Sequence, residues 1–324
     1  MAQTRTAPLP AAKGRSSSKA WVEKKLPWRA VWRRHWMIYL MMLPAAVMLV
    51  VFHLYPLWGI GFAFVKYSPT KGLMASPFVG LEHFKRFLTG PNSLNILRNT
   101  LVIAVGKLAM GEIAGLVFAL LINEIRSVAF RRVVQTTTTL PHFLSWVLIG
   151  GVVTEVLSST GVVNKAVTAL GFDAVRFLGS AKLFPGTLIL AETWKEFGWG
   201  AVIYLAALTA INPELYEAAA VDGAGRWARL WHISLPGIMP IIVLLSCLSL
   251  GGILNAGFEQ VLVFLNPIVM PTGDILDTYI YRVGLLSGEI SLGTAVGVFK
   301  SVIGFALVWL SYWMADKFAN YRIF

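Results

Sequence analysis

Residues 38–65 read IYLMMLPAAVMLVVFHLYPLWGIGFAFV and contain no Asp, Glu, Lys or Arg. A helix that crosses the hydrocarbon core of a bilayer needs roughly 20 apolar residues, at about 1.5 Å of rise per residue. The stretch exceeds that length and predicts a membrane-spanning helix over residues 36–65. The whole chain agrees, because 56% of its 324 residues are hydrophobic and 14% are charged, which is more apolar surface than one soluble core buries.

Five further apolar segments indicate the rest of the fold. Each is long enough to cross a bilayer as a helix, and none shows the alternation of a strand. They cover residues 98–122, 133–157, 184–211, 236–264 and 294–316. We therefore expect an all-α integral membrane protein with six transmembrane helices, five of them in a core over residues 98–316.

Two connections on the expected outer side are long. Residues 66–97 form a predicted periplasmic loop, and residues 158–183 form the second. Each is long enough to hold a short helix on the membrane surface. The second also carries apolar residues at helical spacing: Val162, Val163, Val167 and Leu170.

A basic tail, residues 1–35, orients the chain. Nine of the 28 Lys and Arg residues precede Trp36, against one acid, Glu23. This excess predicts a cytoplasmic N-terminus, and six spans return residues 317–324 to the same side. The later loops carry no such bias, so the orientation depends on the tail. Its basic residues favour contact with anionic lipid, and without a zinc-finger or basic-helix pattern we do not expect nucleic-acid binding.

Motifs for catalysis are missing from the sequence. Cys247 is the single cysteine, which excludes an internal disulfide, a CxxC pair and a thiolate metal site. The sequence has no GxxxxGKS or GxxxxGKT segment for phosphate binding, and no HExxH or GxSxG motif. We therefore expect a chain that is not an enzyme, with no catalytic residue, cofactor or metal of its own.

The segment between the fourth and fifth spans, residues 214–236, predicts a helix-turn-helix. Residues 217–221 are strong helix formers, and Gly223 and Gly225 permit a sharp bend. Residues 226–233 can resume the helix, and Pro236 fits the first turn of the next span. Such a lever between two spans can seat in a groove of a partner, where Glu217 offers a charge to a basic residue.

This segment resembles the EAA loop of the permeases of binding-protein-dependent ABC importers. Glu-Ala-Ala at 217–219, then three residues, Gly223, nine residues, Ile233, one residue and Leu-Pro at 235–236 match that loop without a gap. Several fixed positions at set offsets between predicted spans are more specific than a lone glycine motif. The resemblance implies a MetI-like architecture whose cytoplasmic coupling helix docks on an ATP-hydrolysing subunit. The coupling residues would be Glu217, Ala218, Ala219, Asp222, Gly223, Ala224, Ile233, Leu235 and Pro236.

Other segments resemble the LplB-like branch of oligo- and polysaccharide permeases. They are FVGLEHF at 78–84, LPHFLSW at 140–146 and DTYIYRVGL at 277–285. The resemblance implies an inner-membrane importer for an oligo- or polysaccharide, an acidic one such as alginate included. It also implies a second permease subunit, two ATP-binding subunits that hold ATP and Mg, and a periplasmic solute-binding protein.

Charged residues inside the expected spans also point to function, because each costs about 2.5–3.5 kcal/mol at the bilayer centre on insertion scales. Lys107 and Glu112 are five residues apart, so helical spacing does not pair them. Glu192, Lys195 and Glu196 share one helix face. The alternative to an ABC importer is an ion-coupled secondary transporter with Glu192 or Glu259 as its ion site. The full set of such charges is Lys107, Glu112, Glu192, Lys195, Glu196, Glu259 and Lys300.

The resemblance also suggests where a substrate would lie. In the related maltose permease, the spans before and after the EAA loop hold the sugar part-way across the membrane. Counting back from Glu217 places that stretch near residues 191–198, and Asn255 and Glu259, expected one turn apart on the next span, would face the same path. Because residue identities differ, only the location is carried over. The expected path residues are Thr193, Trp194, Lys195, Gly198, Asn255 and Glu259.

Two interpretations of this path stay open. Trp194 can stack on a sugar ring, while Lys195 can attract the carboxylate of an acidic oligosaccharide. Alternatively, Trp194 and Trp199 belong to an interfacial aromatic belt, and Lys195 pairs with Glu192 inside the helix bundle.

Overall fold

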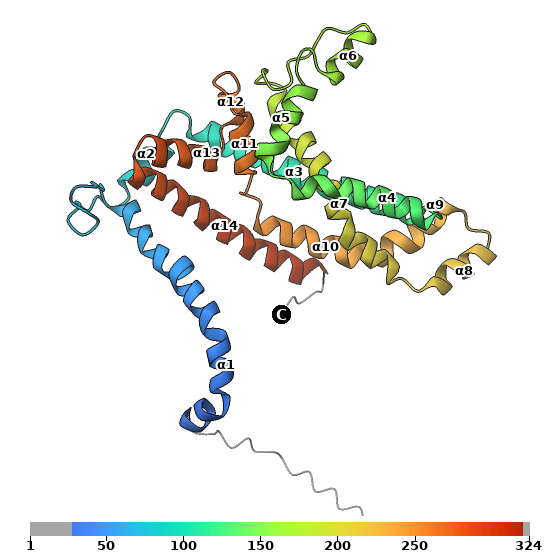
Figure 1. Cartoon of the computed structure of the whole chain (residues 1–324), viewed down its shortest axis with the longest axis horizontal. Helices are drawn as coiled ribbons and strands as arrows, with labels where there is room; N and C mark the ends of the chain where they lie inside the picture. Colours follow the sequence, from blue (N-terminus) through green and yellow to red (C-terminus); the bar gives the residue numbers. More distant parts are fainter. Residues whose placement is uncertain (1–27, 320–324) are drawn as a thin grey trace, which may run out of the picture. The chain divides into compact units, whose positions relative to one another are not determined.

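Helices account for the regular structure of residues 28–319, the part that the computed structural model describes (Figure 1). An isolated antiparallel bridge joins Val65 to Phe78. The all-α prediction is therefore confirmed for this part of the chain. Most of the expected basic tail, residues 1–27, and residues 320–324 of the expected C-terminal end lie outside the described residues. The chain divides into two compact units, Met1–Leu57 and Trp58–Phe324, which are described separately.

The described part of the first unit begins with helix α1, Trp28–Leu49, which is followed by a π-helical turn, Val50–Leu54. A 3-10 helix, Tyr55–Phe64, begins in this unit and continues into the second. Together, His35–Phe64 forms 30 helical residues, whose most apolar 18-residue stretch has a mean hydropathy of 2.2 and no buried residue. A helix that is apolar all round and uncovered needs lipid or another protein around it. The expected first span is thus long and apolar enough to cross a membrane.

Three helices of the second unit also have the length and composition of a membrane span: α3, Ser93–Asn123; Arg226–Gly251; and Ile290–Trp313 of α14, Ile290–Ala319. Arg226–Gly251 comprises α9, Arg226–Arg229, a π-helical turn, Leu230–Ser234, and α10, Leu235–Gly251. A bent helix pair can supply one more span. Helix α7, Phe184–Thr209, is long enough, but every stretch of it that could span contains Glu192, Lys195 and Glu196. The count of six spans therefore stays a prediction.

Two expected spans are not straight helices. The one predicted at 133–157 is α4, Val128–Thr139, a 3-10 turn, Leu140–Phe143, and α5, Trp146–Val156, with a bend of 109° between its halves. The one predicted at 236–264 is wrong as a single helix, because α10 ends at Gly251 and α11, Phe258–Phe264, begins after an irregular segment. Gly257 in that segment has a φ of +84°, which a helix does not allow.

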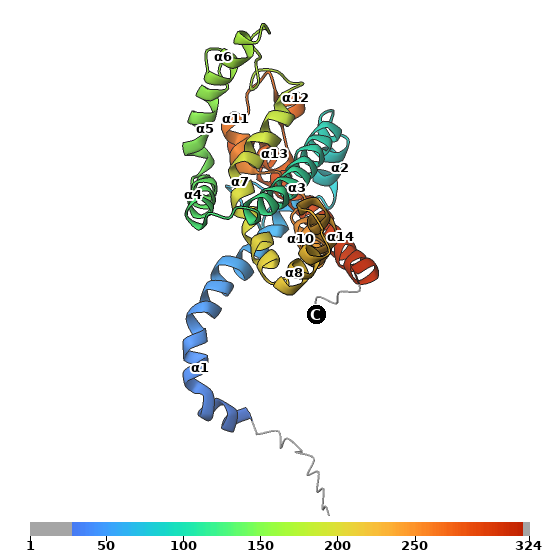
Figure 2. The ribbon, with the colours of Figure 1, turned by 90° about the vertical axis from the view of Figure 1, so that its right-hand side faces the viewer.

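Short helices fill the connections. Helices α2, Glu82–Leu88, and α6, Val162–Ala169, lie in the two long loops, as expected. Helix α8, Pro213–Val221, lies between α7 and α9. Figures 1 and 2 place α6 and α12 at one end of the second unit and α8 at the other. The remaining short elements are α12, Met270–Gly273, α13, Leu276–Ile280, and a π-helical turn, Tyr281–Leu286.

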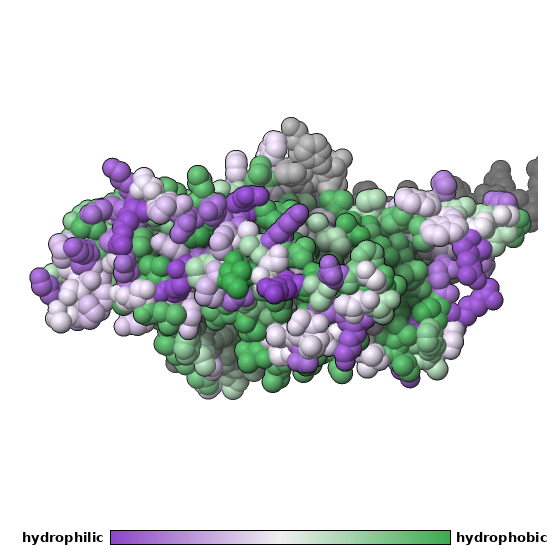
Figure 3. Space-filling model, turned by 90° about the horizontal axis from the view of Figure 1, so that it is seen from above, coloured by the Kyte–Doolittle hydropathy of each residue, from purple (hydrophilic) through white to green (hydrophobic). Residues whose placement is uncertain are grey.

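Small residues let α3 and α7 pack closely. A Cβ placed on Gly115 of α3 would lie 3.3 Å from the carbonyl carbon of Gly200 on α7. Close backbone approach at small residues is a common basis of helix packing in membranes. Buried side chains of both helices, with Ile238 of α10, complete this core. Figure 3 shows that apolar side chains cover large parts of one outer face, as expected for a surface in contact with lipid or another subunit.

Gly198 is a second close contact, and it tests the packing. A Cβ there would overlap the backbone carbonyl of Thr138 at the end of α4, whereas a Cβ on Gly200 would meet nothing within 4 Å. We expect Gly198→Ala to lower the free energy of unfolding by about 1–3 kcal/mol, because the backbone of α4 must move. Gly200→Ala, on the same helix, should change it little or raise it by up to about 1 kcal/mol through helix propensity. Thermal unfolding of the purified protein in detergent measures both, and equal stability of the two variants would contradict this packing.

Candidate functional site

The irregular segment between α10 and α11 is held by two lysines from different helices. Lys107 of α3 donates from Nζ to the carbonyl oxygen of Ala256 at 2.6 Å. Lys300 of α14 donates to Oδ1 of Asn255 at 3.0 Å. Within a membrane, irregular backbone is tolerated only where protein buries it or where it lines a water-filled cavity. The two lysines therefore explain how the chain can leave helical conformation here.

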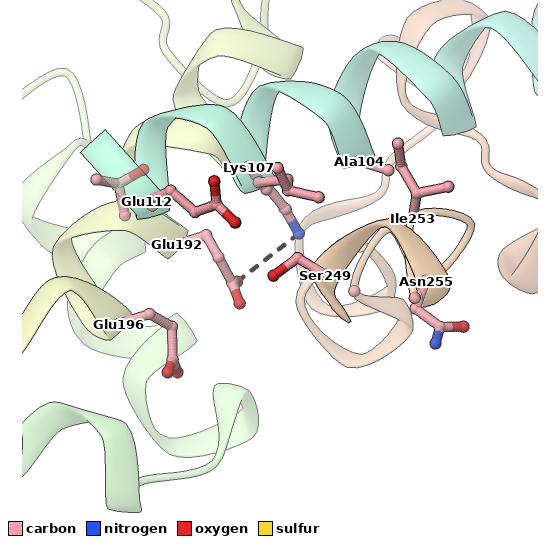
Figure 4. Close-up of a pocket in the computed structure, with 13 residues that line it drawn as sticks. Ala104, Lys107, Glu112, Glu192, Glu196, Ser249, Ile253 and Asn255 are labelled. Carbon is pink, nitrogen blue, oxygen red and sulfur yellow. Dashed lines mark ion pairs between the residues drawn. The ribbon is translucent and has the colours of Figure 1, made fainter. Parts of the chain in front are cut away.

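A cavity of about 380 Å³ lies beside this segment (Figure 4). Its walls come from α3, α7, the end of α10 and the irregular segment. In Figure 4, Lys107, Glu112 and Glu192 approach one another from α3 and α7. The volume falls within the range typical of small-molecule sites, roughly 300–1,000 Å³. Its polar lining residues are Lys107, Glu112, Glu192, Thr193, Glu196, Ser249 and Asn255.

The charges at the cavity are only partly paired. Nζ of Lys107 lies 3.7 Å from Oε2 of Glu192, which is an ion pair but beyond hydrogen-bond distance. Glu112 accepts a hydrogen bond on Oε2 from the hydroxyl of Ser246 at 2.8 Å. Glu112 is thus bonded to α10 and not to Lys107, which agrees with the prediction that the two residues do not pair within α3.

Lys195 is not part of the cavity lining, and its charge is engaged by Glu196, which is. Its Nζ donates to Oε1 of Glu196 at 2.8 Å and to the carbonyl oxygen of His142 at 3.1 Å, and its side chain is 8% exposed. The expected pairing of Lys195 with Glu192 is therefore wrong. The bend between α4 and α5 brings His142 to α7, where its Nδ1 also lies 2.6 Å from Oε2 of Glu196. Helical spacing within α7 carries no information about this partner from another helix.

The expected path residues do not form one surface. Thr193 and Asn255 line the cavity. Trp194 is half-exposed, and Gly198 packs against the backbone of α4. Glu259 is exposed in the first turn of α11 and is not part of the lining, so the expected one-turn spacing from Asn255 is wrong because the helix is interrupted between them.

Apart from Glu192, which served only as the ion site of the alternative transporter, four polar residues of the cavity lining had no role on the expected path. Lys107 and Glu112 were recognised as charges in a span, but the resemblance pointed only to the spans on either side of the EAA loop. Glu196 is on α7, and Ser249 is at the end of α10. A charge inside an apolar segment was the signal that could have identified Lys107, Glu112 and Glu196. Ser249 has no such signal.

A further ion pair connects α14 to α13. Nζ of Lys300 lies 2.7 Å from Oδ1 and 2.9 Å from Oδ2 of Asp277, and the two side chains are 17% and 22% exposed. Because the same Nζ also binds Asn255, Lys300 joins α13, α14 and the irregular segment. Nearby, buried Asp274 accepts a hydrogen bond from Thr278 at 2.8 Å and pairs with Arg282. Burial raises the pKa of the Asp274 carboxyl, although these two partners act to lower it.

At the opposite end, α8 has well-defined caps. Asn212 accepts a hydrogen bond on Oδ1 from the amide of Glu214 at 3.0 Å. The helix ends in a Schellman motif, with bonds from the Ala224 amide to the Ala219 carbonyl at 2.8 Å and from the Gly223 amide to the Ala220 carbonyl at 3.2 Å. Gly223 has a φ of +78°, so the predicted bend at this residue is confirmed.

Side-chain contacts fix α8 to the helices around it. The hydroxyl of Tyr216 lies 3.0 Å from that of Ser234, at the start of α10. Arg226 of α9 lies 3.8 Å from Glu124, just after α3. The outer face of this region is open: Glu217, Ala218 and Asp222 are exposed, Ala219 and Ala224 are half-buried, and Val221 and Trp227 are 88% and 76% exposed. Ile233, Leu235 and Pro236 lie on the last residues of the π-helical turn and the first of α10.

Similarity to known proteins extends over nearly the whole chain. Residues 111–320 match the family model described as binding-protein-dependent transport system inner membrane component. Protein LplB of Bacillus subtilis (strain 168) is 39% identical over 302 residues, which are 93% of this chain and 95% of that protein. The polygalacturonan/rhamnogalacturonan transport system permease protein YteP of the same organism is 42% identical over 288 residues, 89% of this chain and 90% of that protein.

Solved structures show the same fold. A chain in the crystal structure of a bacterial ABC transporter involved in the import of the acidic polysaccharide alginate is 36% identical, with a TM-score of 0.82. The similarity covers 90% of this chain and 98% of that chain. A second structure, of the bacterial alginate ABC transporter in complex with an alginate pentasaccharide-bound periplasmic protein, matches with the same identity and TM-score over 91% and 99%.

The Lys300–Asp277 pair gives a stability test. We expect Lys300→Met to lower the free energy of unfolding by about 3 kcal/mol, because it leaves the largely buried Asp277 carboxylate without a cation. The double variant Lys300→Met/Asp277→Leu should recover most of that loss. Arg86→Met, which breaks the exposed Arg86–Glu289 pair, should cost less than about 1 kcal/mol. Denaturant unfolding in mixed micelles measures the free energy of unfolding of the three variants. An equally small effect in all three would mean that the Lys300–Asp277 pair does not stabilise the fold.

Proposed function

Since the chain belongs to the family of binding-protein-dependent transport system inner membrane components, we propose that it forms half of the transmembrane pore of an ATP-driven importer for an oligo- or polysaccharide. One observation carries this proposal: α8 lies between α7 and α10, the two helices that also supply walls of the cavity. A force applied to α8 would act on both walls. A partner that binds the exposed face of α8 can then change the shape of the cavity by moving α7 and α10.

The proposed partner of α8 is an ATP-hydrolysing subunit. The coupling residues suggested by the EAA loop lie on α8, on its Schellman turn and at the start of α10. Exposed Glu217 and Val221 offer a charge and an apolar contact to a cleft on that subunit. ATP and Mg would bind there, because this sequence has no segment that cradles phosphates. ATP-driven closure would push α8 and rock α7 and α10 between inward-open and outward-open states.

The remaining partners follow from the assembly of such importers. A second permease subunit would complete the pore, two ATP-binding subunits would drive it, and a periplasmic solute-binding protein would deliver the substrate. The similar alginate transporter, solved with a pentasaccharide-bound periplasmic protein, supports the last of these. Both termini would lie in the cytoplasm, with the basic residues beside the first span in contact with anionic lipid.

The proposed substrate is an acidic oligo- or polysaccharide such as alginate. The names of two similar proteins support this class, since one refers to polygalacturonan and rhamnogalacturonan and the other to alginate. Family membership favours this reading over an ion-coupled secondary transporter. Of the two ion-site residues of that alternative, Glu259 lies outside the cavity, whereas Glu192 lines it and forms an ion pair with Lys107.

The coupling role of α8 gives a direct test in proteoliposomes that contain the complete importer. Glu217→Lys should lower ATP-dependent uptake and substrate-stimulated ATP hydrolysis at least about tenfold, because it reverses the charge offered to the partner. Gly223→Pro should act similarly by removing the left-handed turn. Asp173→Lys makes the same charge change on an exposed residue after α6, at the other end of the unit, and should leave both rates unchanged.

Two results would contradict the proposal at different levels. Unchanged ATP hydrolysis and uptake in the fully assembled Glu217→Lys and Gly223→Pro importers would remove the coupling role of α8. Saccharide uptake by the unaltered chain without ATP or an ATPase subunit would contradict an ATP-driven importer altogether.

A further inference from the structure

Three buried acceptor atoms beside the cavity have no hydrogen-bond partner. Within the described part of the chain, they are Oε1 of Glu112, Oε2 of Glu192 and Oε1 of Gln260. Most buried polar side-chain atoms in folded proteins are hydrogen-bonded, and leaving one unpaired is unfavourable. Glu112 and Glu192 line the cavity directly. Two of these atoms thus belong to residues that face a space where a bound molecule could pair with them.

Gln260 joins this group although it lies behind the lining. Its side chain is fully buried, and Nε2 donates to the carbonyl oxygen of Leu188 at 2.9 Å, which leaves Oε1 as the free end of the amide. This oxygen is 3.9 Å from the point where a Cβ of Gly257 would stand, and Nζ of Lys107 is 2.5 Å from the same point. Gly257 lines the cavity. Nζ of Lys107 therefore takes up the space that a side chain of Gly257 would fill, and the Gln260 oxygen lies directly behind this part of the lining.

The cations near the cavity are already engaged. Lys107 donates to the Ala256 carbonyl and faces Glu192, while Lys195 donates to Glu196. Glu112 has a serine hydroxyl as its partner and no cation. The lining thus has one carboxylate more than the lysines that neutralise it. Glu192 and Glu196 have Lys107 and Lys195, and Glu112 is the additional carboxylate. A carboxylate brought into this space would meet unpaired acceptors and an excess of negative charge, whereas a hydroxyl would meet acceptors that lack a donor.

We propose that Glu112, Glu192 and Gln260 accept hydrogen bonds from hydroxyl groups of the passing saccharide. This half of the pore then contacts the hydroxyl side of the sugar unit in the cavity, and the carboxylate of that unit faces away from it. The proposal rests on the saccharide-importer function proposed above. It replaces the expectation that Lys195 attracts a sugar carboxylate, because the contacts of Lys195 leave it no free charge toward the cavity.

The test uses the complete importer in proteoliposomes with ATP and its binding protein. The probes are an alginate pentasaccharide and the same pentasaccharide with its carboxyl groups reduced to alcohols. Glu112→Gln removes the charge and keeps the shape, and Gln260→Leu removes a neutral acceptor. Glu155→Gln, on an exposed residue of α5 away from the cavity, is the matched control. Each variant is compared with the unaltered chain for the same probe, so that the contribution of the binding protein cancels.

We expect Glu112→Gln to raise the KM for the reduced probe about tenfold, because a charged acceptor of a hydroxyl is lost. The rise for the acidic probe should be smaller, because the same change removes a repulsive charge. Gln260→Leu should raise the KM for both probes by the same factor, and Glu155→Gln should change neither. If Glu112→Gln does not assemble, Gln260→Leu alone still tests the hydrogen bond.

Two outcomes would overturn the proposal while leaving the importer function intact. Unchanged KM values in both cavity variants would show that the unpaired atoms hold water only. A selective loss of the acidic probe in Glu112→Gln would show that the sugar carboxylate binds here. Absence of ATP-dependent uptake of either probe by the unaltered chain would instead contradict the proposed function itself.

Discussion

Polar groups inside a membrane have no water to bind, so each must find its partner within the protein. The segment between α10 and α11 meets this constraint through Lys107 and Lys300, which bind the backbone of Ala256 and the side chain of Asn255. Without these two cations the irregular backbone would be unfavourable, and α10 would favour continuing as a helix. The cavity exists because the helix stops here, so the constraint on hydrogen bonding also creates the space for a ligand.

The same constraint separates what the sequence could predict from what it could not. Apolar length alone identified the helix over His35–Phe64, and the glycine at 223 identified the bend after α8, because both signals are local. The interruption after Gly251 was missed although Gly251, Gly252, Asn255 and Gly257 favour a break, because the prediction of this span followed apolar length alone. The contacts of Lys195 with His142 and of Glu192 with Lys107 were missed because these partners come from the 3-10 turn after α4 and from α3, and spacing within one helix says nothing of its neighbours.

Close packing and polar contacts have different roles in this architecture. The approach of α3 to α7 at Gly115 and Gly200 places Lys107 and Glu112 opposite Glu192, so the packing of small residues sets the charges at the cavity. Helix α8, by contrast, is held by its caps and by the contact of Tyr216 with Ser234, and its outer face stays open. An element that must bind a partner and transmit motion needs a rigid base and an uncovered face.

The balance of charge decides what the cavity can bind. An intramembrane lysine would ordinarily suggest an anionic ligand, yet Lys107 and Lys195 already have carboxylate and carbonyl partners. What remains unpaired is a set of acceptors, and acceptors select donors whatever the charge of the rest of the ligand. Each unit of a 1,4-linked acidic polysaccharide presents hydroxyls on one side of its ring and a carboxylate on the other. A cavity whose unpaired buried side-chain atoms are acceptors therefore favours the hydroxyl side of the unit it holds, which leaves the carboxylate of that unit to be matched elsewhere in the assembly.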